Sequence, residues 1–168
     1  MFQIRNIKIS IKVKPLVLNN AIERLENNGI TLKTYSNFLT FKTHNFTYVL
    51  FKKGQRKHSH LNVTQIPSLN LIKKSIRVIE KYLGCSVLYY KIDNIIATSD
   101  LKQSVNLIDI VNRRRFDKIK YNNEIFPGLF IKFPSGTVII FHSGKIVIVG
   151  CKNQKTIKWI LEIVHANI

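Results

Sequence analysis

The side chains that could carry out catalysis are few and scattered in this sequence. Its nine Asp and Glu residues form no close pair of the kind that acid–base hydrolysis requires. The chain has no Walker loop and no G-x-S-x-G motif. His58, His60 and Cys85 could in principle bind a metal, but their spacing matches no zinc pattern. We therefore expect neither an enzyme nor a cofactor.

A large excess of basic over acidic residues distinguishes the composition of the 168 residues. Lys and Arg number 27 against 9 Asp and Glu, which gives a net charge of +18. So many like charges repel one another in a compact chain and destabilise it. The excess of positive charge therefore favours a polyanionic partner. The alternative is a codon bias toward Lys, which would not by itself deplete the carboxylates. The cluster at residues 113–115 is either a phosphate-facing or solvated helix end, or a localisation signal.

Cysteine content and hydropathy predict an intracellular setting without a membrane. Two cysteines, Cys85 and Cys151, do not make a disulfide framework, and no signal peptide is recognisable. No apolar run approaches the ~18 residues of a membrane span. The longest candidate, residues 136–150, is interrupted by polar residues and predicts a hairpin.

The chain contains an internal repeat. Residues 38–41 and 48–54 resemble residues 126–129 and 138–144, and residues 5–10 resemble residues 93–98. A nearly constant offset indicates a tandem duplication of a unit of about 85 residues, with residues 1–86 and 87–168 as the two repeats. Two such repeats can pack together as one pseudo-symmetric body that carries two copies of the same surface. Such a body suits a ligand that is itself nearly two-fold symmetric, and duplex DNA is one. The landmarks recur at offsets of 88, 88 and 90 residues: Asn6 with Asn94, Phe38 with Phe126, and Phe51 with Phe141.

Each repeat must position these residues with the same order of elements. In the first repeat, alternation predicts a strand over residues 4–13. Helical spacing follows over residues 15–28, with Leu18, Ile22 and Leu25 on one face, and again over residues 68–83, which end at Gly84. Strands at 38–42 and 46–51 flank a short turn.

The second repeat predicts strands at 87–97, 129–133, 137–141 and 145–149, and helices within 105–115 and at 156–166. The sum is an α+β protein with an antiparallel sheet and helices on one face only. The other face then carries an apolar stripe, which indicates a partner surface. The alternative is a core strand covered on both sides. The outward members of the stripe are Ile96, Ile139, Phe141, Val147 and Val149.

The second repeat resembles the C-terminal repeat of TATA-box-binding proteins. The resemblance rests on residues 124–129, 138–145 and 150–152, with residues 91–96 at the strand that opens the repeat. It is strong over residues 87–152 and weak over residues 1–86. It implies a saddle of two pseudo-symmetric repeats, whose curved antiparallel sheet carries its helices on the convex face. These proteins are themselves known cases of minor-groove binding with kinked DNA.

The resemblance also implies which residues contact AT-rich DNA. Two phenylalanine pairs, Phe38 with Phe51 and Phe126 with Phe141, would insert between base steps, although each Phe is alternatively a core residue. Asn6 and Asn94 would face base acceptors, unless they are solvated strand residues. The full set expected at DNA is Asn6, Lys8, Phe38, Val49, Phe51, Asn62, Thr64, Asn94, Ile96, Phe126, Pro127, Lys132, Ile139, Phe141, Lys145, Val147, Val149 and Lys152.

The first repeat departs from the family pattern. Lys8 stands at a small apolar position, and Val149, in the second repeat, replaces a usual threonine. An ungapped alignment would bury Arg56 and His58, at a cost of several kcal/mol. An insertion of about five residues at 55–60 instead turns Leu61 and Val63 inward, and Asn62 and Thr64 toward DNA. Reduced TATA selectivity with stronger phosphate attraction is the resulting hypothesis.

The resemblance further implies protein partners and a setting. Glu124 and Ile125 match the site that binds a TFIIB-like initiation factor and, through it, the RNA polymerase machinery; alternatively Glu124 is a lone surface charge. We expect a monomer on DNA, in the nucleus or at a viral transcription site. The alternatives are a non-catalytic nucleic-acid-binding domain of an enzyme with the same fold, and a protein-only adaptor module.

Overall fold

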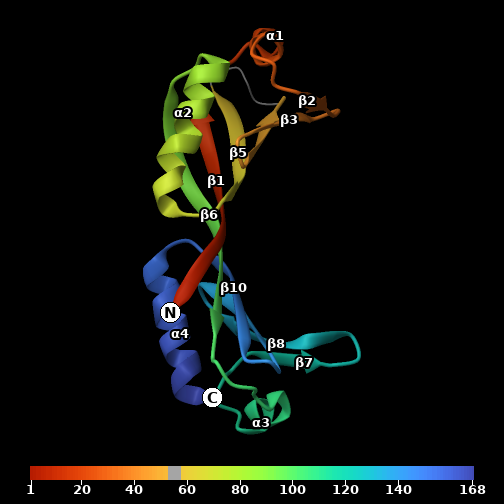
Figure 1. Ribbon diagram of the computed structural model, residues 1–168, viewed down its shortest axis with the longest axis vertical. Coiled ribbons are helices and arrows are strands. Elements are labelled where there is room, and N and C mark those ends of the chain that lie inside the picture. Colours follow the sequence, from red (N-terminus) through yellow and green to blue (C-terminus); the bar gives the residue numbers. More distant parts are fainter. Residues whose placement is uncertain (53–57) are drawn as a thin grey trace. The chain divides into compact units, whose positions relative to one another are not determined.

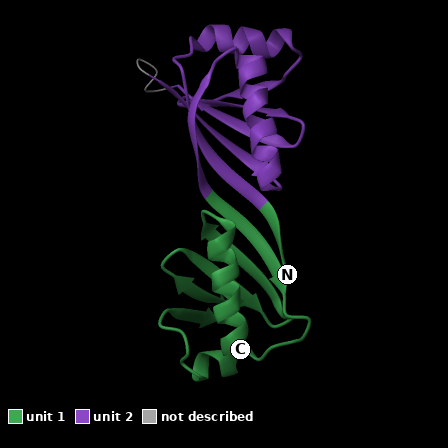
Figure 2. Ribbon diagram, turned by 90° about the vertical axis from the view of Figure 1, so that its left-hand side faces the viewer, with its two compact units in different colours: residues 1–5, 94–168 green, residues 6–93 purple. Residues whose placement is uncertain are grey.

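The computed structural model describes residues 1–52 and 58–168, and these divide into two compact units (Figure 2). Unit 1 consists of residues 1–5 and 94–168, and unit 2 consists of residues 6–93. Strands β1 (Phe2–Val13) and β6 (Val87–Asp100) run through both units. The predicted repeat boundary at residues 86 and 87 is defined by sequence and stays a prediction, because the spatial units divide within these two strands.

Unit 2 is a sheet with helix α2 packed on one face (Figure 1). Its strand order is β2-β3-β4-β5-β1-β6, and the pairs from β2 to β1 are antiparallel. Besides β1 and the first part of β6, it contains α1 (Leu18–Asn27), β2 (Leu32–Thr34), β3 (Phe38–Thr43), β4 (Phe46–Phe51), β5 (Ser59–Ile66), the 3-10 turn η1 (Leu69–Leu71) and α2 (Ile72–Leu83).

Unit 1 repeats this arrangement with helix α4 on one face of its sheet (Figure 1). Its strand order is β1-β6-β10-β9-β8-β7, and the pairs from β6 to β7 are antiparallel. Besides the ends of β1 and β6, it contains α3 (Leu107–Asn112), β7 (Ile119–Asn122), β8 (Phe126–Phe133), β9 (Gly136–Phe141), β10 (Lys145–Cys151) and α4 (Gln154–Asn167).

Alternation along the strands separates a buried face from an open one. In β1, Ile7, Ile9, Ile11 and Val13 are at most 1% exposed, whereas the residues between them are half-buried. Each such buried side chain contributes about 1.5–3 kcal/mol to folding. The buried face lies toward α2 in unit 2 and toward α4 in unit 1. We call the opposite face of each sheet the open face.

Helix ends follow the predicted stop signals. The amide of Gly84 donates to the Glu80 carbonyl at 3.1 Å, and Gly84 adopts a φ of +63°, which glycine accommodates without strain. Helix α1 begins three residues later than predicted. The Leu16 amide donates to Ser59 Oγ at 3.0 Å, which keeps the segment before the helix extended. Its fully buried residues are Ala21 and Leu25, while Leu18 and Ile22 are only half-buried.

Two short edge strands, β2 and β7, were not predicted, because three or four residues carry too little alternation. The inward positions predicted for Leu61 and Val63 are correct, since both are fully buried. The insertion predicted at 55–60 falls partly outside the described residues. Its last two residues, Ser59 and His60, are not in a loop but pair with Val13 and Lys12 of β1.

Candidate nucleic-acid interface

A row of side chains crosses the open face of unit 1 from strand to strand. Lys120 of β7 pairs with Phe130 of β8, which pairs with Ile139 of β9. Ile139 pairs with Val147 of β10, which pairs with Thr98 of β6. Directly opposed residues on one face of a sheet pack against each other. This unit 1 row is therefore a continuous, mostly apolar strip that is half-exposed at its centre.

Unit 2 carries the equivalent row on its own open face. Lys33 of β2 pairs with Thr40 of β3, which pairs with Val49 of β4. Val49 pairs with Asn62 of β5, which pairs with Ser10 of β1. This unit 2 row begins with a lysine, as the unit 1 row does, but its centre is polar. The predicted outward positions of Val49, Asn62 and Thr64 are those that the structure shows.

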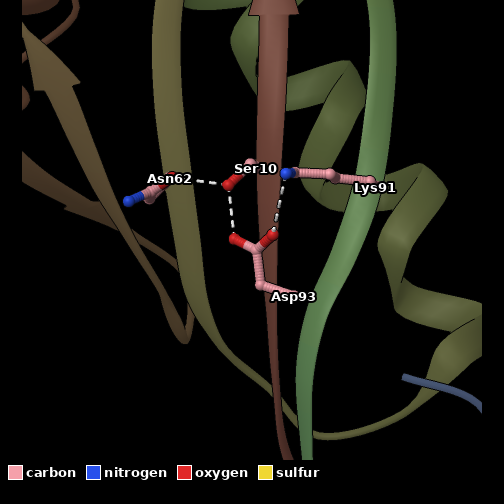
Figure 3. A network of polar contacts seen from close by, with 4 residues as sticks. All are labelled: Ser10, Asn62, Lys91 and Asp93. Carbon is pink, nitrogen blue, oxygen red and sulfur yellow. Dashed lines mark hydrogen bonds and ion pairs between the residues drawn. The ribbon is translucent and has the colours of Figure 1, made fainter. Parts of the chain in front are cut away.

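Each row ends at a charged side chain from the neighbouring strand. In unit 1, Arg5 Nε donates to Thr98 Oγ1 at 2.9 Å. In unit 2, the Ser10 hydroxyl donates to the Asp93 carboxylate, as Figure 3 shows. Ser10 and Thr98 are 88 residues apart, as are Arg5 and Asp93. Equivalent positions of the two units therefore carry opposite charges.

Asn6 and Asn94 make the same contact in their respective units. Asn6 Oδ1 accepts a hydrogen bond from the Gln65 amide at 2.8 Å, and Asn94 Oδ1 accepts one from the Gly150 amide at 2.6 Å. Both partners have a left-handed backbone, with φ of 64° and 87°, beside a β-bulge. Because the backbone occupies the amide oxygen, each side chain has its NH₂ group left as a donor.

Phe126 and Phe141 lie together on the open face of unit 1. Their ring centroids are 5.9 Å apart, and Phe126 also lies 5.2 Å from Phe130. The Phe126 side chain is 37% exposed, and Phe141 is half-buried, so neither is a fully buried core residue. A Cβ on Gly128 would stand 2.6 Å from the Phe126 ring, which shows that the ring folds back over this glycine.

Phe38 and Phe51 are direct cross-strand partners on the open face of unit 2. The register differs from that expected from the 88-residue offset, because Gly128, not Phe126, is the partner of Phe141. The β3–β4 hairpin and the β8–β9 hairpin both have two-residue turns. Phe38 lies two residues closer to the turn of its hairpin than Phe126 does to the turn of its own. Phe38 is therefore equivalent to Gly128, and its ring stacks on Tyr35 at 4.6 Å.

Lysines surround the apolar centre of the unit 1 open face. Lys132 and Lys152 line one hollow of about 390 Å³, and Lys145 and Arg5 line another of about 1020 Å³ with Phe141. A third hollow, of about 650 Å³, contains three residues that sequence reasoning missed: Phe130, Lys118 and Lys120. Phe130 alternates with Gly128 and Lys132 along β8, a signal that could have identified it. The two lysines lie on or beside β7, which was not predicted.

The remaining site residues lie where the strands place them. Lys8, Ile96, Ile139, Val147 and Val149 are half-buried on the open faces, and Pro127 follows Phe126 at the exposed start of β8. Glu124 and Ile125 belong to the turn before β8, in which the Glu124 amide donates to Asn122 Oδ1 at 3.1 Å. Ile125 is 81% exposed.

The cysteine and tyrosine side chains with raised pKa values lie off the open faces. Burial, reinforced by the nearby Glu80 carboxylate, raises the pKa of the Cys85 thiol to about 11. Burial also raises the pKa of Cys151 and that of Tyr48, whose hydroxyl donates to the Ser75 carbonyl at 3.1 Å. Over residues 1–52 and 58–168, no group of three or more His, Cys, Asp or Glu side chains could hold a metal ion. No helix in these ranges is long and apolar enough to cross a membrane.

The fold and the open faces define a class: two-repeat α+β proteins whose open sheet surfaces combine aromatic, amide and cationic side chains. The profile of the family described as "Transcription factor TFIID (or TATA-binding protein, TBP)" matches residues 89–168. The solved structure of Methanococcus jannaschii TBP superposes with a TM-score of 0.80 and 28% identity, covering 97% of this chain and 95% of that one.

Curated relatives agree with this match. The TATA-box-binding protein of Picrophilus torridus is 30% identical over 118 residues, and that of Thermoplasma volcanium is 28% identical over the same length. The matched segments span 66% of this chain and 61% of the length of each relative. The chain belongs to the TATA-box-binding protein family. The predicted family and the predicted α+β fold class are confirmed.

Proposed function

We propose that this chain is a transcription initiation factor that binds duplex DNA through its open faces, in the minor groove, and bends it. The observation that carries the proposal is the identical setting of Asn6 and Asn94. Each amide oxygen is held by a backbone N–H, which leaves an NH₂ donor. In the minor groove, A·T and T·A pairs present only acceptors. Each amide donor therefore suits A·T pairs in either orientation.

The apolar centre of the unit 1 row supports the same conclusion. Phe130, Ile139 and Val147 offer no hydrogen-bonding group, and such a surface suits the widened minor groove of a bent duplex, where shape dominates. Phe126 and Phe141 are half-exposed rings at one end of β8 and β9, positioned to act as a wedge between base steps. Lys132, Lys145 and Lys152 supply cations for the phosphates.

Bending and salt dependence test the proposal together. A 30-base-pair A·T-rich duplex with a fluorophore at each end should show increased energy transfer when the protein binds, and a G·C-rich duplex should not. The logarithm of the binding constant should fall with the logarithm of salt concentration with a slope of roughly −4, if Lys8, Lys132, Lys145 and Lys152 each neutralise one phosphate. Binding that depends on salt but leaves the duplex straight would contradict the proposal and favour the protein-adaptor alternative.

We propose further that the turn before β8 docks a TFIIB-like initiation factor. Asn122 shapes this turn, since its side chain accepts from the Glu124 amide and its carbonyl accepts from the Ile125 amide at 3.3 Å. The turn therefore presents an exposed carboxylate beside an 81% exposed isoleucine. A charged rim beside an apolar anchor is a common composition for a protein-binding site.

Charge reversal tests this docking site. Glu124→Arg should keep binary DNA binding but abolish the supershift by the cognate TFIIB-like factor in a gel assay, and Ile125→Ser should weaken it. Glu162→Arg makes the same charge change on the exposed side of α4 and should supershift normally. A normal supershift with Glu124→Arg would refute the docking site.

We also propose that this chain acts as a monomer on DNA, in the nucleus or at a viral transcription site.

A further inference from the structure

The two rows differ most at their ends, where hydrogen-bond donors in unit 1 are replaced by acceptors in unit 2. Arg5 in unit 1 is a cation with only donors, and one of them is used by Thr98. Asp93 in unit 2 is an anion with only acceptors, and one of them is used by Ser10. Of the four carboxylates in the described part of unit 2, only Asp93 lies on a strand.

Hydrogen-bond accounting shows what the unit 2 cluster presents to a ligand. Ser10 Oγ contacts the Asp93 carboxylate and lies 3.0 Å from Asn62 Oδ1, yet a hydroxyl carries one proton. If Asp93 takes that proton, the Asn62 amide satisfies Ser10 by rotating to donate its NH₂ group, and its oxygen then points outward. Figure 3 shows these side chains on the near side of the strands, with α2 behind them. The cluster therefore presents acceptors on the open face.

The charge of Asp93 is only weakly compensated within the protein. Lys91 Nζ lies 3.8 Å from Asp93 Oδ1, but its side chain is 61% exposed, and exposed ion pairs contribute little. The Asp93 side chain is 23% exposed, so a duplex covering it would remove its remaining water. Ser10 donates one hydrogen bond to this carboxylate, and leaving its remaining acceptor positions desolvated and unpaired is costly, which means that a ligand on this face must supply a second donor. In unit 1, by contrast, the Asp100 carboxylate accepts from the Lys102 amide at 2.8 Å, within the turn after β6.

Only one base pair type offers such a donor in the minor groove. A·T pairs present acceptors alone, whereas G·C adds the N2 amino group of guanine. We propose, building on the proposed DNA-binding function, that the Asp93 carboxylate accepts a hydrogen bond from a guanine N2 amine. The preferred element is then asymmetric: A·T pairs under the donor-rich row end of unit 1, and a G·C pair under Asp93. This asymmetry would also orient the protein on its element.

A positional scan with guanine and inosine tests the proposal, because inosine differs from guanine only by the missing N2 amine. One G·C pair is moved stepwise through an A·T duplex, and each duplex is compared with its I·C counterpart by competition binding. The wild type should prefer guanine over inosine by about tenfold at one position, a preference within the range of one good side-chain contact to a base edge. Asp93→Ala should reduce the ratio to about one at that position.

Two controls separate the effect of the amine from the effects of charge and folding. Glu162→Ala removes the same charge from the exposed side of α4 and should keep the guanine preference. Asp93→Asn, which keeps the shape and one acceptor, should retain part of it, and thermal melting reports whether each variant is folded. A preference for guanine that persists in folded Asp93→Ala would overturn the proposal, as would a scan in which the wild type never prefers guanine.

The all-A·T duplex distinguishes failure of this inference from failure of the proposed function. If the wild type binds and bends that duplex but shows no guanine preference, only the role of Asp93 is wrong. If it neither binds nor bends any duplex in the scan, the DNA-binding function itself is wrong, and the inference falls with it.

Discussion

Replacing Phe126 with alanine should abolish most of the DNA bend at small cost to the fold. Alanine in place of a fully buried Phe costs about 3–5 kcal/mol. Phe126, however, is 37% exposed, and its ring contacts are with Phe130 and Phe141 on the same open face. Aromatic pairs contribute about 0.5–1.5 kcal/mol each, and for this partly exposed ring we take the low end for both pairs, which gives a total loss of about 1 kcal/mol. For a chain of this length that corresponds to a fall in Tm of about 2–4 °C.

Gly128→Ala should remove the bend while keeping the Phe126 ring. The new Cβ would stand 2.6 Å from Phe126 Cε1 and 2.7 Å from Ile139 Cγ2. Carbon atoms pack at about 3.5–4.0 Å, so the ring must move by about 1 Å or more. Because Ile139 lies within the sheet and Phe126 at its exposed end, the aromatic ring is the group that gives way. The wedge would then be present but displaced from Phe141.

Energy transfer across an end-labelled A·T-rich duplex measures the bend, and thermal melting measures the fold. Trp159→Ala is the matched control, since Trp159 is a 47% exposed aromatic residue on α4 that contacts Phe133 at 5.9 Å. It should cost a similar amount of stability and leave the bend unchanged. The reasoning is refuted if Phe126→Ala bends DNA normally while its Tm falls by much more than 4 °C, because Phe126 would then be a core residue.

Lys8→Val should sharpen the preference for A·T duplexes and make the salt slope less steep by about one, because one phosphate contact is lost; an unchanged slope would place Lys8 away from DNA. Tyr48→Phe should lower stability by about 0.5–1.5 kcal/mol in urea unfolding, since one buried hydrogen bond to the Ser75 carbonyl is lost, without changing DNA affinity. The Cys85 thiol, with its pKa raised to about 11, should be alkylated slowly at pH 8, and the rate should rise about tenfold per pH unit below that pKa because only the thiolate reacts. Glu80→Gln should speed the reaction by removing a charge that opposes thiolate formation; equal rates in the two proteins would show that Glu80 does not act on the thiol.

Local patterns in the sequence were sufficient to determine the elements and the faces of most strands. The alternation of Ile7, Ile9 and Ile11 predicted which side of β1 is buried, because successive side chains of a strand point to opposite faces. Gly84 marked the end of α2, because a left-handed residue there favours glycine. The charge surplus and the repeat indicated a polyanionic partner, and the motif around Phe126 identified the family. These signals are local or compositional, so they need no knowledge of which strands pair.

Tertiary structure alone decided which open-face residues meet. Strand register aligned Phe38 with Gly128, although counting residues from the repeat had aligned it with Phe126. Periodicity placed Ser10 on the open face but could not assign Asp93 as its partner, 83 residues away. A strand pattern specifies a face, whereas cross-strand partners depend on hairpin turn lengths and bulges that accumulate along the chain. Arg5 of unit 1 and Asp93 of unit 2 are equivalent positions with opposite charges. This difference became visible only when strand pairing placed Arg5 beside the Thr98 hydroxyl and Asp93 beside the Ser10 hydroxyl.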